Sequence, residues 1–152
     1  MMSLKTLIFV YWMALLSSTC AYADLGGDLT SLQKDSKVLA TPITVTTHPQ
    51  YDLHEMKTGG ARVHEFMGSS GKVFGVAWAG KKHPDLRTLM GAHYDEFQKA
   101  FAQARHQRRH GGSVIVEVGN LHVEMGGHMM AISGQVWLKD QIPTGMDLHE
   151  IQ

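Results

Sequence analysis

The last third of the chain carries the clearest alternation of apolar and polar positions. Val, Leu, Ile and Met recur there at every second residue, which is typical of half-buried strands. The pattern predicts strands at residues 113–118, 121–125 and 128–138. A Gly-Asn pair at 119–120 and a Gly-Gly pair at 126–127 are favoured two-residue hairpin turns. The resulting register places ten residues on one apolar surface: Val114, Val116, Val118, Leu121, Val123, Met125, Met130, Ile132, Val136 and Leu138.

An earlier region is also rich in β-branched and aromatic residues, which favour strands. Gly- and Ser-containing runs at 58–60 and 68–71 divide it and are typical of hairpin turns. The strands predicted here are residues 43–47, 51–56, 61–67 and 72–79.

Between these two regions, apolar residues recur every three or four positions, as on one face of a helix. Pro84 suits a first helical turn, and Asp85 places negative charge at the positive end of the helix dipole. We therefore expect one continuous helix at 85–109, ended by the Gly-Gly pair at 111–112. A close approach of helix to sheet would explain Gly91 within it. The apolar stripe consists of Leu86, Leu89, Met90, His93, Tyr94, Phe97, Phe101 and Ala104.

These patterns predict an α+β fold, with an antiparallel sheet of about six strands in two meanders. One long amphipathic helix packs on a face of this sheet. Residues 24–152 are enough to bury about two thirds of their unfolded surface, so we expect a single globular domain. A short helix beginning at Asp28 and a short segment after Ile142 complete the chain. Whether the meanders form one sheet or two stays open at this point.

The N-terminal residues have the order of a secretory signal peptide. Lys5 supplies positive charge, residues 7–16 are an uncharged apolar run, and Ala21 and Ala23 are small residues at the positions that signal peptidase reads. We expect cleavage after Ala23 and a periplasmic or secreted protein. This run of ten residues is too short to span a membrane, and no other apolar stretch approaches the length of a membrane-spanning helix.

Composition narrows the functional classes. Cys20 is the one cysteine and precedes the expected cleavage point, so residues 24–152 exclude a disulfide scaffold, a thiol oxidoreductase and a cysteine hydrolase. Fourteen Lys and Arg balance fourteen Asp and Glu, which leaves no strong field to attract nucleic acid. We therefore expect no nucleic-acid partner.

Histidine and methionine are the chemically notable residues. Imidazole and thioether bind copper, and imidazole with carboxylate suits zinc. The metal-ligand set that we consider is His122, Glu124 and His128, with Met125, His128 and Met130 as a second group at the Gly-Gly pair. The ten histidines are dispersed, without an H-E-x-x-H motif, and His122 beside Glu117 reads more simply as a cross-strand pair. Copper or zinc is thus an alternative rather than the favoured interpretation.

Enzymatic motifs give less support. The chain has no G-x-S-x-G nucleophile elbow and no phosphate-binding loop. An unrecognised envelope hydrolase stays a second alternative. A binding module would instead expose an apolar patch, and Trp137 on the predicted solvated face of the sheet would be its centre.

The segments 71–80, 83–86 and 89–91 resemble the bacterial family catalogued as domain of unknown function 2844. In matching order the resemblance also takes in Leu25 to Gly27, Tyr51, Glu55, His64 to Phe66, Gly126 to Met129, Gly134, Ile142 and Pro143.

The resemblance implies an exported bacterial protein, and it implies no activity or binding residue because none is assigned to the family. Met130 departs from it, since a basic residue is expected there. The resemblance draws attention to the strand-to-helix crossover, namely Trp78, Gly80, Pro84, Asp85 and Gly91. We therefore predict a non-catalytic periplasmic or secreted accessory protein that binds an envelope protein or component. Trp78, Pro84, Asp85 and Trp137 are its candidate surface.

Overall fold

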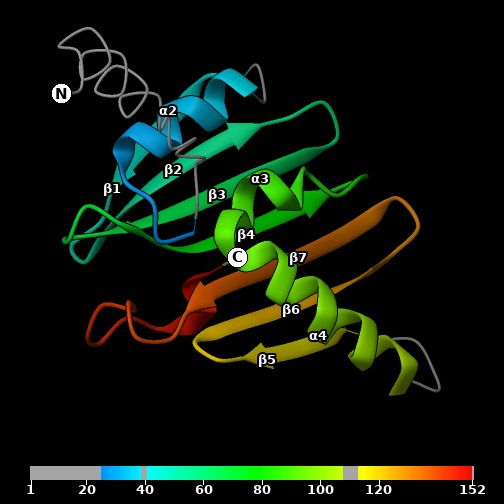
Figure 1. Ribbon diagram of the computed structural model, residues 1–152. Helices are drawn as coiled ribbons and strands as arrows, with labels where there is room; N and C mark the ends of the chain where they lie inside the picture. Colours follow the sequence, from blue (N-terminus) through cyan, green and yellow to red (C-terminus); the bar gives the residue numbers. More distant parts are fainter. Residues whose placement is uncertain (1–24, 39–40, 108–112, 152) are drawn as a thin grey trace, which may run out of the picture.

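The computed structural model describes residues 25–38, 41–107 and 113–151, which contain a seven-stranded antiparallel sheet (Figure 1). The order across the sheet is β1-β2-β3-β4-β7-β6-β5. Both meanders therefore belong to one sheet, joined at its centre by β4 and β7. The strands are β1 (Ile43–Thr47), β2 (Tyr51–Lys57), β3 (Ala61–Gly68), β4 (Val73–Gly80), β5 (Val114–Val118), β6 (Leu121–His128) and β7 (Ala131–Leu138).

The predicted α+β class and antiparallel sheet are confirmed. Each of the seven segments predicted as strands forms one, so the sheet has seven strands where about six were expected. The short stretch Ile43–Thr47 pairs with β2 along its whole length and forms one edge of the sheet. After β4 the helical segment carries the chain to the opposite edge, so that the second meander returns and brings β7 beside β4 (Figure 1).

The first hairpin of the second meander has the predicted register. Val114 pairs with Met125, Val116 with Val123, and the turn falls at 119–120. The alternating residues of both strands are buried toward the helices, as expected.

The second hairpin corrects the prediction, because its turn lies at Met129 and Met130 instead of at the Gly-Gly pair. Gly126 and Gly127 continue β6. A Cβ on Gly127 would lie 2.2 Å from the carbonyl oxygen of Ala131. Glycine is therefore needed at this position because β6 and β7 approach each other closely there. Met130 consequently leaves the predicted apolar surface.

That displacement changes the register by an even number of residues. Val123 faces Val136 instead of Met130, and a strand keeps its two faces under an even shift. Val136 and Leu138 are therefore buried on the predicted side.

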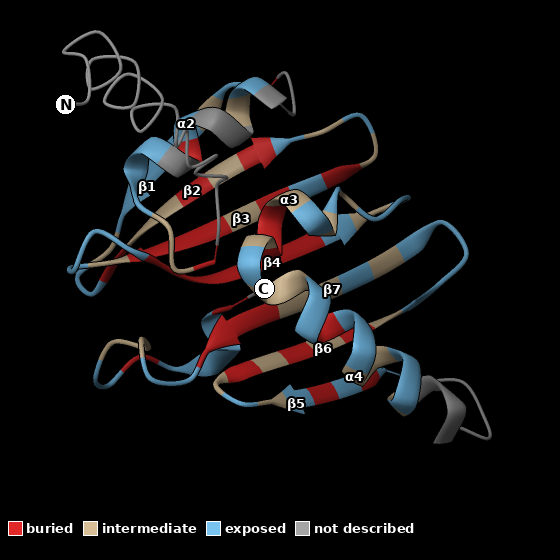
Figure 2. Cartoon of the chain, in the orientation of Figure 1, coloured by how far each residue is buried: buried red, intermediate tan, exposed pale blue. Residues whose placement is uncertain are grey.

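Helices cover one face of the sheet (Figure 1). They are α2 (Leu29–Val38), α3 (Leu86–Met90), the 3₁₀ turn η1 (Gly91–His93) and α4 (Tyr94–Gln107). Asp28 caps α2 by accepting a hydrogen bond from the Thr30 N–H. The core on this face extends from β2 to β5, and its buried residues are red in Figure 2. It includes Leu32, Met56, Val63, Val76, Trp78, Leu89, Met90, Phe97, Val116, Leu121, Val123, Val136 and Leu138.

The helix predicted as one rod packs on the sheet but is interrupted. Gly91 ends α3 with a φ of 45°, in the left-handed region, and its N–H donates to the Arg87 carbonyl. Gly91 thus caps a helix, which corrects the expectation that it allows close packing on the sheet. The interruption lets α3 and α4 differ in direction, and α4 packs against β5 at the far edge. The expected end at 111–112, like the signal peptide, lies outside the described residues.

The C-terminal segment covers part of the opposite face, around Trp137, while Ile115, Glu117 and Ser133 on the same face stay exposed. Met146 and Ile151, on either side of the 3₁₀ turn η2 (Leu148–Glu150), join a second core. The Tyr51 hydroxyl donates to Glu150 Oε2 at 2.9 Å and holds this segment in place. The remaining members of the second core are Phe66, Phe74, Ala77 and Trp137.

Candidate functional site

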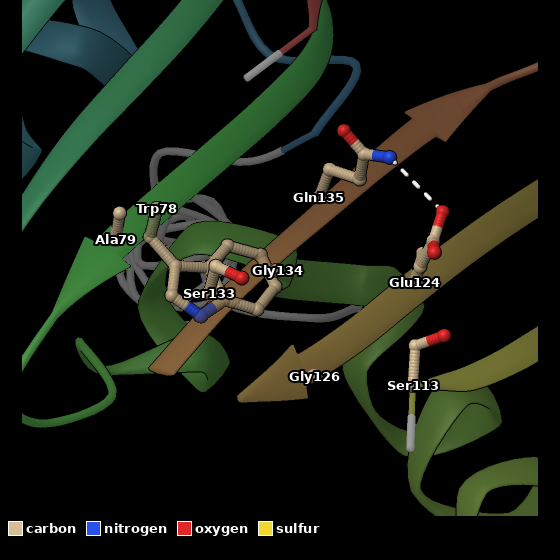
Figure 3. A pocket seen from close by; sticks show the side chains of 8 residues that line it. All are labelled: Trp78, Ala79, Ser113, Glu124, Gly126, Ser133, Gly134 and Gln135. Atoms are coloured by element: carbon tan, nitrogen blue, oxygen red, sulfur yellow. Dashed lines mark hydrogen bonds between the residues drawn. The ribbon is translucent and has the colours of Figure 1, made fainter. Parts of the chain in front are cut away.

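Trp78 anchors the strand-to-helix crossover from the central strand β4. Its side chain is only 2% exposed. The indole lies over Gly134 of β7, where a Cβ would come within 2.3 Å of the ring (Figure 3). Trp78 is therefore a buried packing residue, which corrects its assignment to an exposed surface.

The Trp78 indole N–H donates to Nδ1 of His83 at 3.2 Å. Because Nδ1 accepts this bond, the neutral ring carries its proton on Nε2. Burial lowers the pKa of His83 and so favours the neutral ring. The hydrogen bond fixes the start of the helical segment to the sheet.

Asp85 stands at the start of the helical segment, as predicted, and it is the N-cap of α3. Its Oδ1 accepts from the Arg87 N–H at 3.1 Å and the Thr88 N–H at 3.4 Å. Its Oδ2 accepts from the Thr88 hydroxyl at 2.7 Å. Both carboxylate oxygens are thus used to begin a helix. Pro84 precedes this cap, which corrects its predicted place in the first helical turn.

A groove of about 870 Å³ lies between this crossover and α4. Tyr94, Phe97 and Phe101 form an aromatic wall on α4. The ring centroids of Tyr94 and Phe97 are 6.3 Å apart, and those of Phe97 and Phe101 are 5.2 Å apart. Met125 of β6 also lines the groove. The other lining residues are His83, Pro84, Asp85, Leu86, Arg87, Gln98 and Ala102.

Arg87 brings positive charge to the aromatic wall. Its guanidinium carbon lies 4.4 Å from the centroid of the Tyr94 ring, a cation–π contact. The same guanidinium approaches Asp95 at 3.4 Å. Both charged groups are largely exposed, so this ion pair orients Arg87 more than it stabilises the fold.

A smaller hollow of about 380 Å³ lies beside Gly126 and Gly134, which have no side chain to fill it (Figure 3). Gln135 donates to Glu124 Oε2 across it at 3.1 Å. Its remaining lining residues are Trp78, Ala79, Ser113 and Ser133. The hydrogen bond engages one oxygen of Glu124, the one carboxylate that lines the hollow.

The structure does not bring together the three predicted metal ligands. His122 Nδ1 lies 2.9 Å from Glu117 Oε1, and Glu124 accepts from Gln135. His128 is six residues along the same strand, about 20 Å from His122. Within 25–38, 41–107 and 113–151, no group of three His, Cys, Asp or Glu residues is placed to hold a metal ion.

His122 instead forms the cross-strand pair with Glu117 that the sequence suggested. The hydrogen bond from His122 and the charge of Lys139 lower the pKa of the Glu117 carboxyl. The imidazole also stacks on Trp137, with 4.0 Å between centroids. Trp137 is 7% exposed, so the prediction of an apolar patch centred on it is wrong.

Sequence reasoning missed the aromatic wall, because it assigned the whole apolar stripe to the sheet core. Phe97 is buried, whereas Tyr94 and Phe101 stay half-buried. No sequence signal separated these positions, because Tyr94 and Phe101 also pack against the core and belong to the same wide apolar face of the helix.

Among the helices of the described segments, none has the length and apolar character needed to cross a membrane. Neither a curated protein nor a solved structure matches the chain. A family model described as "Protein of unknown function (DUF2844)" does match, over residues 21–151. That match covers the sheet, both cores and the groove, and it agrees with the resemblance carried by the crossover segment. The chain therefore belongs to the DUF2844 family.

Proposed function

We propose that this chain is an exported, non-catalytic accessory protein that binds a polypeptide partner through the groove beside α4. The observation that carries the proposal is the aromatic wall of Tyr94, Phe97 and Phe101, which lines about 870 Å³ that no described segment fills. Aromatic residues, Met and Arg are enriched at protein–protein interfaces relative to the rest of the protein surface.

The chemistry of the groove favours a peptide segment with apolar side chains. Met125 offers a polarizable thioether, which adapts to differently shaped apolar groups. Arg87, held on Tyr94, adds a cation beside the rings that can receive a carboxylate or a backbone carbonyl. Burying the partner's apolar surface here would contribute roughly 25 cal/mol per Å² before the cost of association.

The polar groups around the groove support a binding role over a catalytic one. Asp85 uses its carboxylate to cap α3, and His83 uses Nδ1 to hold Trp78. A general base or nucleophile needs a side chain free to reach a substrate, and these two side chains serve the fold.

Export rests on the order of charge, apolar run and small residues that ends at Ala23. The test is to fractionate cells that make the full chain and to sequence the N-terminus of the product. We expect a protein that starts at Asp24 in the periplasmic or extracellular fraction. Full-length protein in the cytosol would contradict export without bearing on the groove.

The groove itself is tested with a photo-reactive amino acid placed at Gln98 or Ala102, both exposed lining residues. The same group at Gln103, exposed on α4 but outside the groove, is the matched control. We expect irradiation of the native host to give one protein adduct from the two groove positions and none from Gln103.

Competition within the groove decides between specific and accidental adducts. Ala102→Arg should fill the groove and abolish the adduct at Gln98, whereas Gln103→Arg should leave it intact. An adduct that survives Ala102→Arg, or that forms equally from Gln103, contradicts the proposal.

A further inference from the structure

The tip of the β6–β7 hairpin exposes two consecutive methionines. Met129 is 90% exposed and Met130 is 64% exposed, the highest values for large hydrophobic side chains among the described residues. They form the two-residue turn between His128 and Ala131, which pair with each other. Large apolar side chains held in water at a turn need a reason other than packing.

The backbone at the tip is strained as well. Met130 has a φ of 70°, and within the described segments it is the one residue other than glycine with a positive φ. Turns that need a left-handed residue normally use Gly or Asn there. A methionine that departs from both the burial pattern and the turn pattern points to a role for its side chain.

His128 stands next to these methionines with one ring nitrogen already engaged. Its Nδ1 lies 3.2 Å from the Met129 carbonyl oxygen. A carbonyl oxygen can only accept, so Nδ1 carries the proton and donates it. In the neutral ring this leaves the lone pair on Nε2. Metal-binding histidines are oriented in this way, with the second ring nitrogen donating to a backbone carbonyl.

We propose that His128, Met129 and Met130 bind a soft monovalent metal ion, Cu(I), through Nε2 and the two thioether sulfurs. Thioether ligands select Cu(I), whereas Zn(II) prefers thiolate, imidazole and carboxylate. Each methionine has three rotatable bonds, so both sulfurs can turn toward an ion beside the tip. Of the three ligands expected from the sequence, His128 alone is retained, because His122 and Glu124 have other partners.

The donor set also suits the compartment that the leader predicts. Residues 24–152 contain no cysteine, so no thiol at the site can be lost to disulfide formation. Thioethers bind Cu(I) without that hazard. This proposal goes beyond the binding function and is independent of the groove, since it uses none of the residues that line it.

The experiment uses the chain from Asp24 to Gln152 with Ag(I), a redox-stable ion of the same charge and softness as Cu(I). The methionine methyl and histidine ring resonances are followed by NMR. We expect one equivalent of Ag(I) to shift the signals of His128, Met129 and Met130, and Zn(II) to shift neither methyl. Competition with a chromophoric Cu(I) chelator under anaerobic, reducing conditions then gives the affinity.

Variants separate sulfur coordination from a merely apolar tip. The double variant Met129→Leu/Met130→Leu keeps the apolar surface and removes both sulfurs. We expect it to lose at least about 100-fold in Cu(I) affinity, which is the upper end of what losing an outer-shell partner costs. Met146→Leu, in the second core, is the matched control and should keep the wild-type affinity.

A free peptide of residues 126–132 tests whether the hairpin forms a built site. The folded chain should bind Ag(I) more tightly than the peptide, because the turn holds the three donors together. Equal affinities would overturn the proposal, as would Ag(I) binding that persists in the double Leu variant or an absence of binding in the wild type.

Discussion

The two turns of the second meander differ in what determines them. The turn at Gly119 and Asn120 follows local chemistry: Gly119 has a φ of 54° at the first central position, as a type II′ turn requires. The turn at Met129 and Met130 has its left-handed residue at the second central position, and that residue is Met130. The turn residues therefore favour the β5–β6 hairpin, whereas the left-handed backbone of Met130 disfavours the β6–β7 hairpin.

Gly127 explains the difference. Its φ of 112° and the approach of the Ala131 carbonyl leave no room for a side chain within the β6–β7 ladder. Glycine there is used for strand packing, so the chain continues to residues 129 and 130 before it reverses. A glycine pair therefore predicts a turn only where the ladder does not need the same residues.

The strongest test of this explanation is Gly127→Ala. The new Cβ would lie 2.2 Å from Ala131 O and 2.7 Å from Ile132 Cα, both backbone atoms that cannot rotate away. We expect a loss of about 3 kcal/mol or more in the free energy of unfolding, measured by urea denaturation. Gly59→Ala, where a Cβ meets nothing within 4 Å, is the control and should change little.

Gly119→Ala gives the matching measurement on the other turn. Space is available, since the nearest atom to the new Cβ is Glu96 Oε1 at 3.6 Å. The cost is then confined to the left-handed backbone, about 1–2 kcal/mol. A loss as large as that of Gly127→Ala would contradict the distinction between a turn glycine and a ladder glycine.

The same distinction explains how far the sequence predicts the fold. The β5–β6 register was predictable because the alternation and the Gly-Asn pair gave the same answer. The β6–β7 register was not, because the Gly-Gly pair signalled a turn and the decisive contact comes from Ala131 across the ladder. The burial of Trp137 depends on a C-terminal segment whose docking has no local signal.

The candidate site follows this rule as well. Asp85 was predictable as a helix cap because capping is local. The indole position of Trp78 was not, since it requires the missing side chain of Gly134 on a strand 56 residues away. The groove beside α4 depends on the break at Gly91, which the periodicity of the stripe does not reveal.

Met130→Gly should act in the opposite direction to the glycine replacements. Glycine adopts a φ of 70° without the Cβ penalty, while it loses more chain entropy on folding. We expect a net stabilisation of up to about 1 kcal/mol, seen as a higher urea midpoint with an unchanged slope. Destabilisation would mean that the Met130 side chain packs against the fold, and that its exposure does not reflect strain.

The smallest expected effect concerns the pair of Glu117 and His122 beside the turn at 119–120. His122 and Lys139 lower the pKa of Glu117 below its ordinary value of 4.5, so the ionised carboxylate favours the folded state. This contribution is fully present above pH 4.5. It is lost as the pH falls from 4.5 through the lower pKa of the folded protein, because the unfolded chain then binds the proton first.

Glu117→Gln should therefore flatten the fall in stability below pH 4.5, in urea titrations at several pH values. His122→Phe removes the donor while keeping a ring on Trp137, and it should flatten the curve less, because Lys139 still lowers the pKa of Glu117. If the pair is responsible, the double variant changes the slope no more than Glu117→Gln alone. Additive changes would show that the two side chains act separately.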